Sequence, residues 1–486
     1  MRMNTNGRGS DTGSSNSRRL TVAVAMATTA GALATGAITT PAYASTNAAL
    51  PVPTSRVATT SADANARIAT KLPLRSISAA IGSNYSINVV DAMTGEAIYS
   101  RNSSTPLLTA SNMKLVTAVS ALTVLGPNTR MATKVYSVGK GAIALVGGGD
   151  TALGPVGVRA LAKKALAAIR ANPALAPGTV ATKPHRPATC RINGRKVTST
   201  AKHPCPLIPG ATRSGKLKIY VDESMYPAPT VPAGWRGGYE PSVVRPVRPL
   251  AMDGHYVMDA GADTANFMAS FLRSKGLSAG YAGKLVVSAG SPLIGTRVSA
   301  TVAEQVKYML QVSENNVAEM LYRNVAIAKG YVGNWAGGAR AAMDVMTSLG
   351  VPTAGLALTS GSGVSRNDRM TTAALTTLLQ RVADRSGHPE LEAIYYGGGL
   401  PLAGVSGTLA ASNGRFTTKP TVCALGKISA KTGTLFDTIG LSGLTVGTDG
   451  RLKAFSILVN SRPQSYSPLA TRKQVDRLAA TVNGCY

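Results

Sequence analysis

A serine and a lysine stand three residues apart at the start of a predicted helix, in the sequence Ser111-Asn112-Met113-Lys114. Side chains at this spacing lie on one face of a helix, so the hydroxyl and the amine can meet. A serine hydroxyl needs an adjacent base, and a lysine serves as that base only where burial or a nearby cation disfavours its charged form. Free N–H groups in the first helical turn would also stabilise a developing oxyanion. The pair therefore predicts an acylating serine nucleophile.

Two further motifs follow in chain order. Ser313-Glu314-Asn315 leads into the apolar-faced stretch Val317–Val325 and can present a hydroxyl beside an amide. Lys431-Thr432-Gly433-Thr434 ends a strand-like run, where the lysine supplies a cation for a carboxylate. Glycine there lets the strand edge approach a ligand, and the edge offers N–H groups to an extended peptide. Single motifs recur by chance at Ser137–Lys140, Ser199–Lys202, Ser86–Asn88 and Ser365–Asn367. Only the ordered set of three points to one site.

Periodic runs predict the elements that must position these residues. Apolar and small residues recur at helical spacing over Thr109–Leu125, which stops at Gly126-Pro127. Further helices are expected at Ser299–Val325, Trp335–Leu349, Thr371–Arg385 and from about Pro468 to Val482. Strands are expected at Tyr85–Asp91, Glu96–Arg101, Lys427–Lys431, Gly440–Val446 and Leu452–Val459. The early hairpin and the late strands would form one antiparallel sheet with packed helices, an α+β catalytic domain interrupted by an inserted β-rich domain.

Changes in composition along the chain predict the domain boundaries. Residues 1–44 resemble an export signal, with Arg18-Arg19, the apolar run Leu20–Ile38 and an Ala-x-Ala site ending at Ala44. A membrane anchor is the alternative, but the run is rich in Gly, Ala and Thr, and no later segment is long and apolar enough, so no stable membrane span is expected. The expected boundaries are a linker over 45–72, the catalytic domain over 73–133 and 291–486, and the inserted domain over 134–290.

Charge and histidine content narrow the functional classes. The net charge is +29, and Lys183–Lys218 holds nine Lys and Arg residues without an acidic one. An exported protein meets little nucleic acid, so anionic cell-wall polymer is the expected partner of this segment, with a merely solvated basic loop as the alternative. The four histidines, His185, His203, His255 and His388, lack metal-ligand spacing. A zinc peptidase is therefore not expected, and no metal or cofactor is predicted.

Four cysteines in an exported chain indicate disulfides. Three pairings are possible. Cys190 and Cys205 enclose a short Pro-flanked loop, and Cys423 and Cys485 both lie towards the C-terminal end. These positions favour Cys190–Cys205 and Cys423–Cys485.

The three motifs together are similar to those of penicillin-recognising serine acyltransferases. More closely, the chain resembles the class C low-molecular-mass penicillin-binding proteins, which are D-alanyl-D-alanine carboxypeptidase/endopeptidases. Other stretches that carry the resemblance are Val89–Glu96, Val146–Asp150, Ser360–Arg366 and Leu400–Leu409. The long interval between Ser111 and Ser313 is also similar, because that family holds extra domains there. The resemblance covers about 75–150 and 235–486 and is poor over 155–235, where the basic segment lies.

The resemblance implies an extracytoplasmic enzyme of the cell wall or a periplasmic-type space, acting on peptidoglycan stem peptides and inhibited covalently by penicillins. It implies that Lys114 takes the proton of Ser111 while Lys431 helps to keep Lys114 neutral. Ser313 would pass a proton to the leaving D-alanine, and Asn315 would hold the substrate amide. It also implies that the N–H groups of Ser111 and Thr434 form the oxyanion hole. Lys431 and Thr432 would bind the terminal carboxylate.

Three alternatives are weaker. A class A β-lactamase would need a Glu-x-x-x-Asn loop, which does not occur between Asn315 and Lys431, although another β-lactamase or an esterase of the superfamily stays open. The nucleophile-elbow pattern Gly276–Gly280 would need a strand before it and a helix after it, whereas helix-like Asp263–Lys275 precedes and strand-like Lys284–Ser288 follows. A non-catalytic wall-binding protein of the same fold is the third alternative, but the polar motif residues are intact.

Overall fold

The computed structural model describes residues 60–485 except 77, 182–184, 193 and 208–211. The expected export signal at 1–44 and the start of the expected linker lie outside the described residues. No helix in the described ranges is long and apolar enough to cross a membrane.

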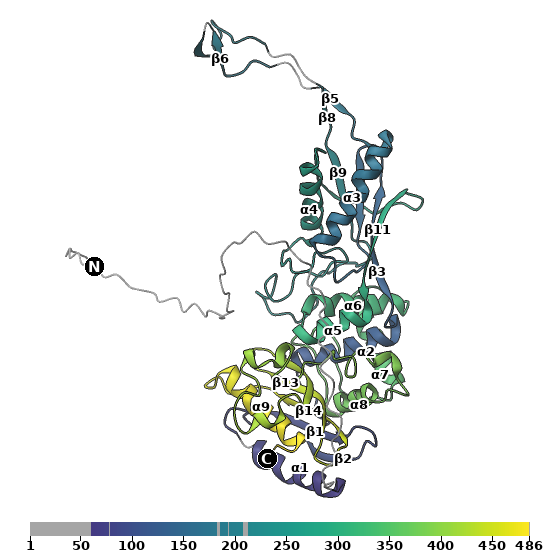
Figure 1. Cartoon of the computed structure of the whole chain (residues 1–486), viewed down its shortest axis with the longest axis vertical. Coiled ribbons are helices and arrows are strands. Elements are labelled where there is room, and N and C mark those ends of the chain that lie inside the picture. The colour runs from purple at the N-terminus through teal and green to yellow at the C-terminus, as the bar shows by residue number, and fades with distance from the viewer. Residues whose placement is uncertain (1–59, 77, 182–184, 193, 208–211, 486) are drawn as a thin grey trace, which may run out of the picture. The chain divides into compact units, whose positions relative to one another are not determined.

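The first sheet joins both ends of the described chain. Its antiparallel order is β12 (Ile428–Thr434), β13 (Ile439–Val446), β14 (Leu452–Val459), β1 (Tyr85–Asp91) and β2 (Ala97–Arg101). Figure 1 shows the early strands β1 and β2 beside the late strands β13 and β14. Every residue of β1 is buried because helices cover both faces of the sheet. The predicted α+β fold with an antiparallel sheet is confirmed.

Five helices form a common hydrophobic core with Leu444, Ala454 and Leu458 on one face of this sheet, and α8 packs directly on the strands. They are α2 (Met113–Leu125), α5 (Val302–Val312), α6 (Asn315–Ala328), α7 (Trp335–Ser348) and α8 (Thr372–Ala383). Helix α2 is buried at every residue from Met113 to Leu122. A helix that is apolar around its whole circumference runs through a core, so the first turn of α2 is held away from water.

The opposite face is covered by α1 (Ser61–Ser76) and α9 (Pro468–Asn483). Helix α1 replaces the expected linker from residue 61 onward. Its buried residues Ala64, Ile68 and Leu72 recur every four positions and therefore form one helix face. Because the sequence around these residues is rich in Ala, Thr and Ser, its helical pattern is too weak to predict the helix. Only the packing against α9 identifies the buried face.

Replacing Leu72 by alanine is expected to lower the free energy of unfolding by about 2–5 kcal/mol, since the side chain is fully buried. The matched control is Leu74→Ala on the same helix, where the side chain is 65% exposed and the change should stay within about 0.5 kcal/mol. Urea unfolding followed by circular dichroism measures both. Equal midpoints for the two variants would show that α1 does not contribute to the stability of the domain.

A second, mixed sheet fills the expected insertion. Its order is β10 (Ala279–Lys284), β9 (Leu217–Asp222), β4 (Ala142–Val146), β3 (Arg130–Ser137) and β11 (Leu293–Thr301). Two amphipathic helices, α3 (Pro155–Ala171) and α4 (Ala260–Ser274), complete its own core. The sheet begins at Arg130 and ends at Thr301, so it extends beyond both ends of 134–290. Helix α3 is not expected from the Gly- and Pro-rich texture of the flanking sequence.

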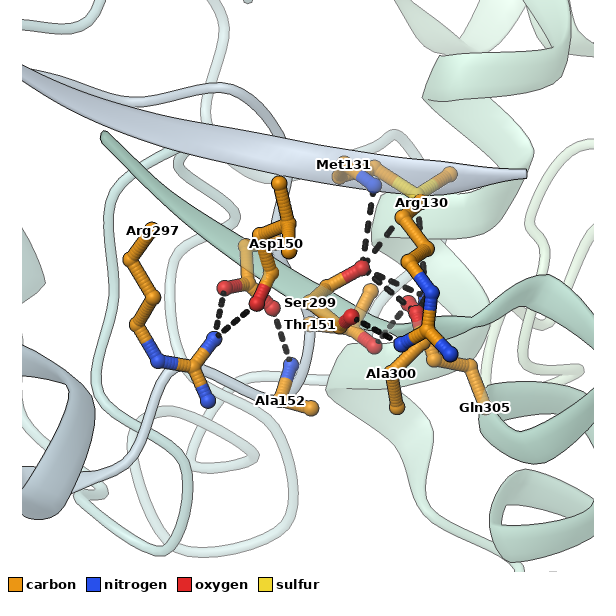
Figure 2. A network of polar contacts seen from close by, with 10 residues as sticks. Arg130, Met131, Asp150, Thr151, Ala152, Arg297, Ser299, Ala300 and Gln305 are labelled. Atoms are coloured by element: carbon orange, nitrogen blue, oxygen red, sulfur yellow. Dashed lines mark hydrogen bonds and ion pairs between the residues drawn. The ribbon is translucent and has the colours of Figure 1, made fainter.

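A polar network joins this sheet to helix α5 (Figure 2). Arg297 on β11 donates to Asp150 at 2.9 Å, and burial nevertheless raises the pKa of Asp150 to about 6. Gln305 on α5 donates to the Ala300 carbonyl at 2.8 Å and accepts from the Thr151 hydroxyl at 2.5 Å. Helix α5 is thereby anchored at the end opposite to Ser313.

Two short strand pairs lie in or directly before the basic segment. They are β5 (Thr179–Ala181), just before it, with β8 (Thr212–Ser214), and β6 (Thr189–Ile192) with β7 (Arg195–Thr198). Disulfides join Cys190 to Cys205 and Cys423 to Cys485, which confirms the favoured pairing. The 3-10 turns are η1 (Ala110–Asn112), η2 (Pro173–Leu175), η3 (Pro389–Leu391), η4 (Gly407–Leu409), η5 (Ala411–Asn413) and η6 (Thr421–Ala424).

Candidate active site

Ser111 lies in the 3-10 turn η1, directly before the α-helix that carries Lys114. The turn is tighter than the expected helical start, and Ala110 adopts a left-handed φ of 47°. Such a conformation costs energy in a residue with a Cβ atom and persists only where the surroundings hold it. Lys114 donates from Nζ to the Ser111 hydroxyl at 3.0 Å. The structure thus brings the predicted serine and lysine into direct contact.

The Lys114 ammonium is fully enclosed. Besides Ser111, it donates to Asn315 Oδ1 at 2.7 Å and to the Ser362 carbonyl at 2.8 Å. Burial lowers the pKa of Lys114 to about 7, although the carboxylates of Glu319 and other acids oppose the shift. Close to neutral pH, a large fraction of this amine is therefore unprotonated and able to accept a proton.

The second motif breaks the helix expected over Ser299–Val325. Helix α5 ends at Val312, and Ser313 has a left-handed φ of 61°. Glu314 then caps α6 by accepting from the Asn316 N–H at 3.0 Å. This break turns Ser313 and Asn315 towards the same centre, which an unbroken helix would not do for neighbours two positions apart.

Lys431 on β12 contacts Ser313 and is enclosed by the protein. Its Nζ donates to the Ser313 hydroxyl at 3.0 Å and to the Thr432 carbonyl at 2.8 Å. The side chain is 0% exposed. Burial, together with the charge of Lys114, lowers the pKa of Lys431 well below its usual value.

A cavity of about 300 Å³ opens over these residues. It is lined by Ser111, Ser313, Thr408, Asn413, Arg415, Thr432, Thr434 and Arg472. The Thr408 and Thr432 hydroxyls lie 2.8 Å apart on its wall. Lys431 is not among the lining residues. Sequence reasoning missed Asn413, Arg415 and Arg472, which belong to no motif and carry no local signal.

Gly433 has a packing role in addition to the expected approach of the strand edge to a ligand. A Cβ atom at Gly433 would lie 2.6 Å from Asn112 Nδ2 and 2.7 Å from the Thr109 carbonyl. The bare backbone therefore lets β12 pack against the turn that carries Ser111. Gly433 sets the distance between the serine and the strand edge.

Gly433→Ala is accordingly expected to displace that turn and to lower kcat/KM on a D-alanyl-D-alanine peptide by about 100-fold, because small misplacements of reacting groups are costly. Gly237→Ala is the control, since a Cβ there meets nothing within 4 Å. Circular dichroism verifies that both variants fold. Full activity of Gly433→Ala would contradict the positioning role.

Two buried carboxylates support the site without having been predicted from the sequence. Glu319 accepts from the N–H groups of Gly361 and Ser362 at 3.0 and 2.9 Å, and from Trp335 Nε1 at 2.8 Å. It thereby orients the Ser362 carbonyl that holds Lys114. Asp368 accepts from the Ser360 hydroxyl at 2.6 Å, and burial raises the pKa of Asp368 to about 7.

In the described part of the chain, no group of His, Cys, Asp and Glu side chains could hold a metal ion. At the nucleophile-elbow pattern Gly276–Gly280, helix α4 precedes and strand β10 begins inside the pattern at Ala279, the reverse of the required strand-to-helix order.

Comparison with known proteins connects this geometry to one family. The profile of the D-Ala-D-Ala carboxypeptidase 3 (S13) family matches residues 49–171 and 254–482. The D-alanyl-D-alanine carboxypeptidase of Actinomadura sp. is 29% identical over 447 residues, covering 80% of this chain and 79% of the relative. Carboxypeptidase DacB of Mycolicibacterium smegmatis is 27% identical over 410 residues, with 82% and 80% covered.

Solved structures show the same fold. Penicillin binding protein 4 from Haemophilus influenzae superimposes with a TM-score of 0.64 at 18% identity, covering 86% of this chain and 99% of that one. A predatory peptidoglycan endopeptidase from Bdellovibrio bacteriovorus gives a TM-score of 0.50 at 14% identity, covering 83% and 93%. The unmatched interval of the family profile, residues 172–253, contains the basic segment.

Proposed function

The chain belongs to the D-Ala-D-Ala carboxypeptidase 3 (S13) family, and on that premise we propose that Ser111 is acylated by peptidoglycan stem peptides ending in D-alanyl-D-alanine. The protein is a serine-type D-Ala-D-Ala carboxypeptidase. The observation that carries the proposed mechanism is the 3.0 Å contact between the Ser111 hydroxyl and the enclosed Lys114 amine.

In the first step, unprotonated Lys114 removes the Ser111 proton as Oγ attacks the carbonyl of the penultimate residue. The N–H groups of Ser111 and Thr434 receive the oxyanion. The C–N bond then breaks, and the leaving amine takes a proton from the Ser313 hydroxyl. That hydroxyl recovers the proton that Lys114 took from Ser111, while Lys431 holds it through their 3.0 Å hydrogen bond. Water next attacks the ester carbonyl while Lys114 takes its proton. The C–O bond to Ser111 then breaks, Oγ recovers that proton, and the shortened peptide leaves with a free carboxylate.

Asn315 is proposed to orient the substrate backbone. Its Oδ1 accepts from Lys114, and one Nδ2 hydrogen is donated to the Val243 carbonyl at 2.9 Å. A side-chain amide has two N–H donors, so the second remains for a substrate carbonyl. Thr432, Gly433 and Thr434 would provide the strand edge along which the peptide lies.

We also infer export to an extracytoplasmic compartment, where stem peptides occur, and covalent inhibition by penicillins at Ser111. The export signal expected at 1–44 and the resemblance of the three motifs support these inferences. Thr432 and Thr434 on the cavity wall would bind the penicillin carboxylate.

The test is release of D-alanine from a pentapeptide, run beside cleavage of a cross-linked peptide dimer and labelling by a fluorescent penicillin. Release of D-alanine with stoichiometric labelling supports the proposal. Cleavage of the cross-linked dimer distinguishes endopeptidase activity from carboxypeptidase activity. Rapid turnover of penicillin without peptide cleavage would favour a β-lactamase. A folded protein that is inert in all three assays would be a non-catalytic wall-binding protein.

We further propose that the basic segment, residues Lys183–Lys218, binds anionic cell-wall polymer. The described side chains Arg191, Arg195, Lys196 and Lys202 are exposed, and no acidic residue lies in the segment. The β6–β7 pair and the Cys190–Cys205 disulfide hold the first three close together. A fixed cluster of cations attracts a polyanion in a salt-dependent manner.

Co-sedimentation with isolated cell walls tests this partner. The variant Arg191→Gln/Arg195→Gln/Lys196→Gln should pellet less than the wild-type protein at low salt. The control Lys163→Gln/Lys275→Gln/Lys473→Gln removes the same charge from exposed positions elsewhere and should pellet normally. Equal pelleting of both variants, or unchanged pelleting on walls stripped of anionic polymer, would contradict binding of the basic segment to that polymer.

A further inference from the structure

We propose that Arg472, on the C-terminal helix α9, is the residue that binds the carboxylate of the leaving group, the role that the motif pattern assigns to Lys431. The inference rests on the proposed function and names a specificity-determining residue for it. It follows from which cations reach the cavity and which already have hydrogen-bond partners.

Lys431 is poorly placed for a carboxylate. Its side chain is 0% exposed, and its Nζ already donates to the Ser313 hydroxyl and the Thr432 carbonyl. The lining of the cavity does not include it. Burial and the charge of Lys114 also lower the pKa of Lys431 well below its usual value. Its contacts suit the positioning of the Ser313 hydroxyl better than anion binding.

Arg472 has the opposite properties. It lines the cavity together with Ser111 and Thr434, and its Nε donates to the Thr434 hydroxyl at 3.3 Å. Among the residues that the structure describes, no carboxylate forms an ion pair with Arg472 and its two terminal nitrogens have no acceptor. A guanidinium stays charged in proteins, and its planar fork matches a carboxylate in a two-point contact.

The surroundings of Arg472 leave its charge uncompensated. The ionisable groups facing it are Arg415, Asp476 and Arg462. Asp476 is bound through both oxygens by Arg415, so its charge is already matched. Arg415 also lines the cavity and is almost fully buried. Partial burial and these neighbouring arginines make a substrate carboxylate a favourable counter-ion.

The position of Thr434 connects this charge to the chemistry. Its N–H is the proposed second donor of the oxyanion hole, and its hydroxyl contacts Arg472. A peptide whose scissile carbonyl lies at the Thr434 N–H therefore has its terminal carboxylate within reach of the guanidinium. An arginine from α9 thus lies beside the motif residues Ser111 and Thr434 at the cavity.

The experiment compares two peptides that end in D-alanyl-D-alanine, one with a free carboxylate and one with a terminal carboxamide. For Arg472→Gln, KM for the carboxylate peptide should rise about 10- to 100-fold with little change in kcat, because a hydrogen-bonded charge pair is lost. KM for the carboxamide peptide should not change. Arg472→Lys, which keeps the charge without the fork, should restore part of the affinity.

Lys473→Gln is the matched control, because it removes the neighbouring charge of the same helix from an exposed position. It should behave as the wild-type enzyme. If Arg472→Gln retains the preference for the carboxylate, or if KM rises equally for both peptides, Arg472 is not the carboxylate ligand. An equal rise would instead indicate a structural role in the cavity wall.

A direct measurement of peptide binding distinguishes failure of this inference from failure of the proposed function. In the Ser111→Ala background, calorimetry measures the affinity for each peptide without turnover. Preferential binding of the carboxylate peptide should disappear when Arg472→Gln is added. If the wild-type enzyme neither cleaves peptide nor takes up penicillin, the proposed function fails, whereas this measurement still decides whether Arg472 binds the carboxylate.

Discussion

Ser111→Ala should abolish both D-alanine release and penicillin labelling, with kcat falling by about 10⁴- to 10⁶-fold, as expected when a nucleophile that acts as a unit with its base is removed. The hydroxyl lies at the cavity wall, 3.0 Å from the Lys114 amine. Deleting it leaves no atom that could carry the acyl group. Binding of the substrate should persist, because the other cavity residues are unchanged.

The control for this prediction comes from a chance repeat of the same motif. Ser199 and Lys202 match the Ser-x-x-Lys pattern but lie in the basic segment, where the Ser199 hydroxyl accepts from the Cys205 N–H at 3.0 Å. Ser199→Ala should retain full activity and labelling. Mass spectrometry of the labelled protein locates the adduct, and an adduct on any residue other than Ser111 would refute the assignment.

Lys114→Met should lower kcat/KM by about 10⁴-fold, since a general base and its orienting contacts are lost together. Methionine fills most of the space left by the lysine without a charge, so the variant should still fold. Lys114→Arg should be equally inactive, because a guanidinium stays protonated and cannot act as the base. Substantial activity in either variant would exclude Lys114 as the base.

The pH dependence provides an independent test of the same residue. Burial lowers the pKa of Lys114 to about 7, and only the unprotonated amine can accept the Ser111 proton. The value of kcat/KM should therefore rise about tenfold per unit as pH increases towards 7, and then level off above it. A flat profile between pH 5 and 8 would contradict a lysine base with this pKa.

Most of the fold around the site was accessible from the sequence, since the signals are local. The hairpin β1–β2, the helices α7, α8 and α9 and the late strands lie within a few residues of their predicted bounds. The exceptions depend on distant partners. Helix α1 is recognisable only by its packing on α9, and α5 and α6 separate at Ser313 because Glu314 caps α6.

What the sequence alone determined about this protein is which polar groups gather at one site, namely Ser111, Lys114 and Ser313, because spacing and order within short motifs specify which groups can meet. It determined the fold class for the same reason, since helical and strand periods are properties of neighbouring residues.

Only the tertiary structure decided the environment of those groups. The pKa of Lys114 depends on burial by segments far along the chain, and the Ser362 carbonyl reaches it through Glu319. The same long-range packing encloses Lys431 and brings Arg472 to the cavity. Desolvation and charge pairing arise from what surrounds a side chain in space, which no local pattern records.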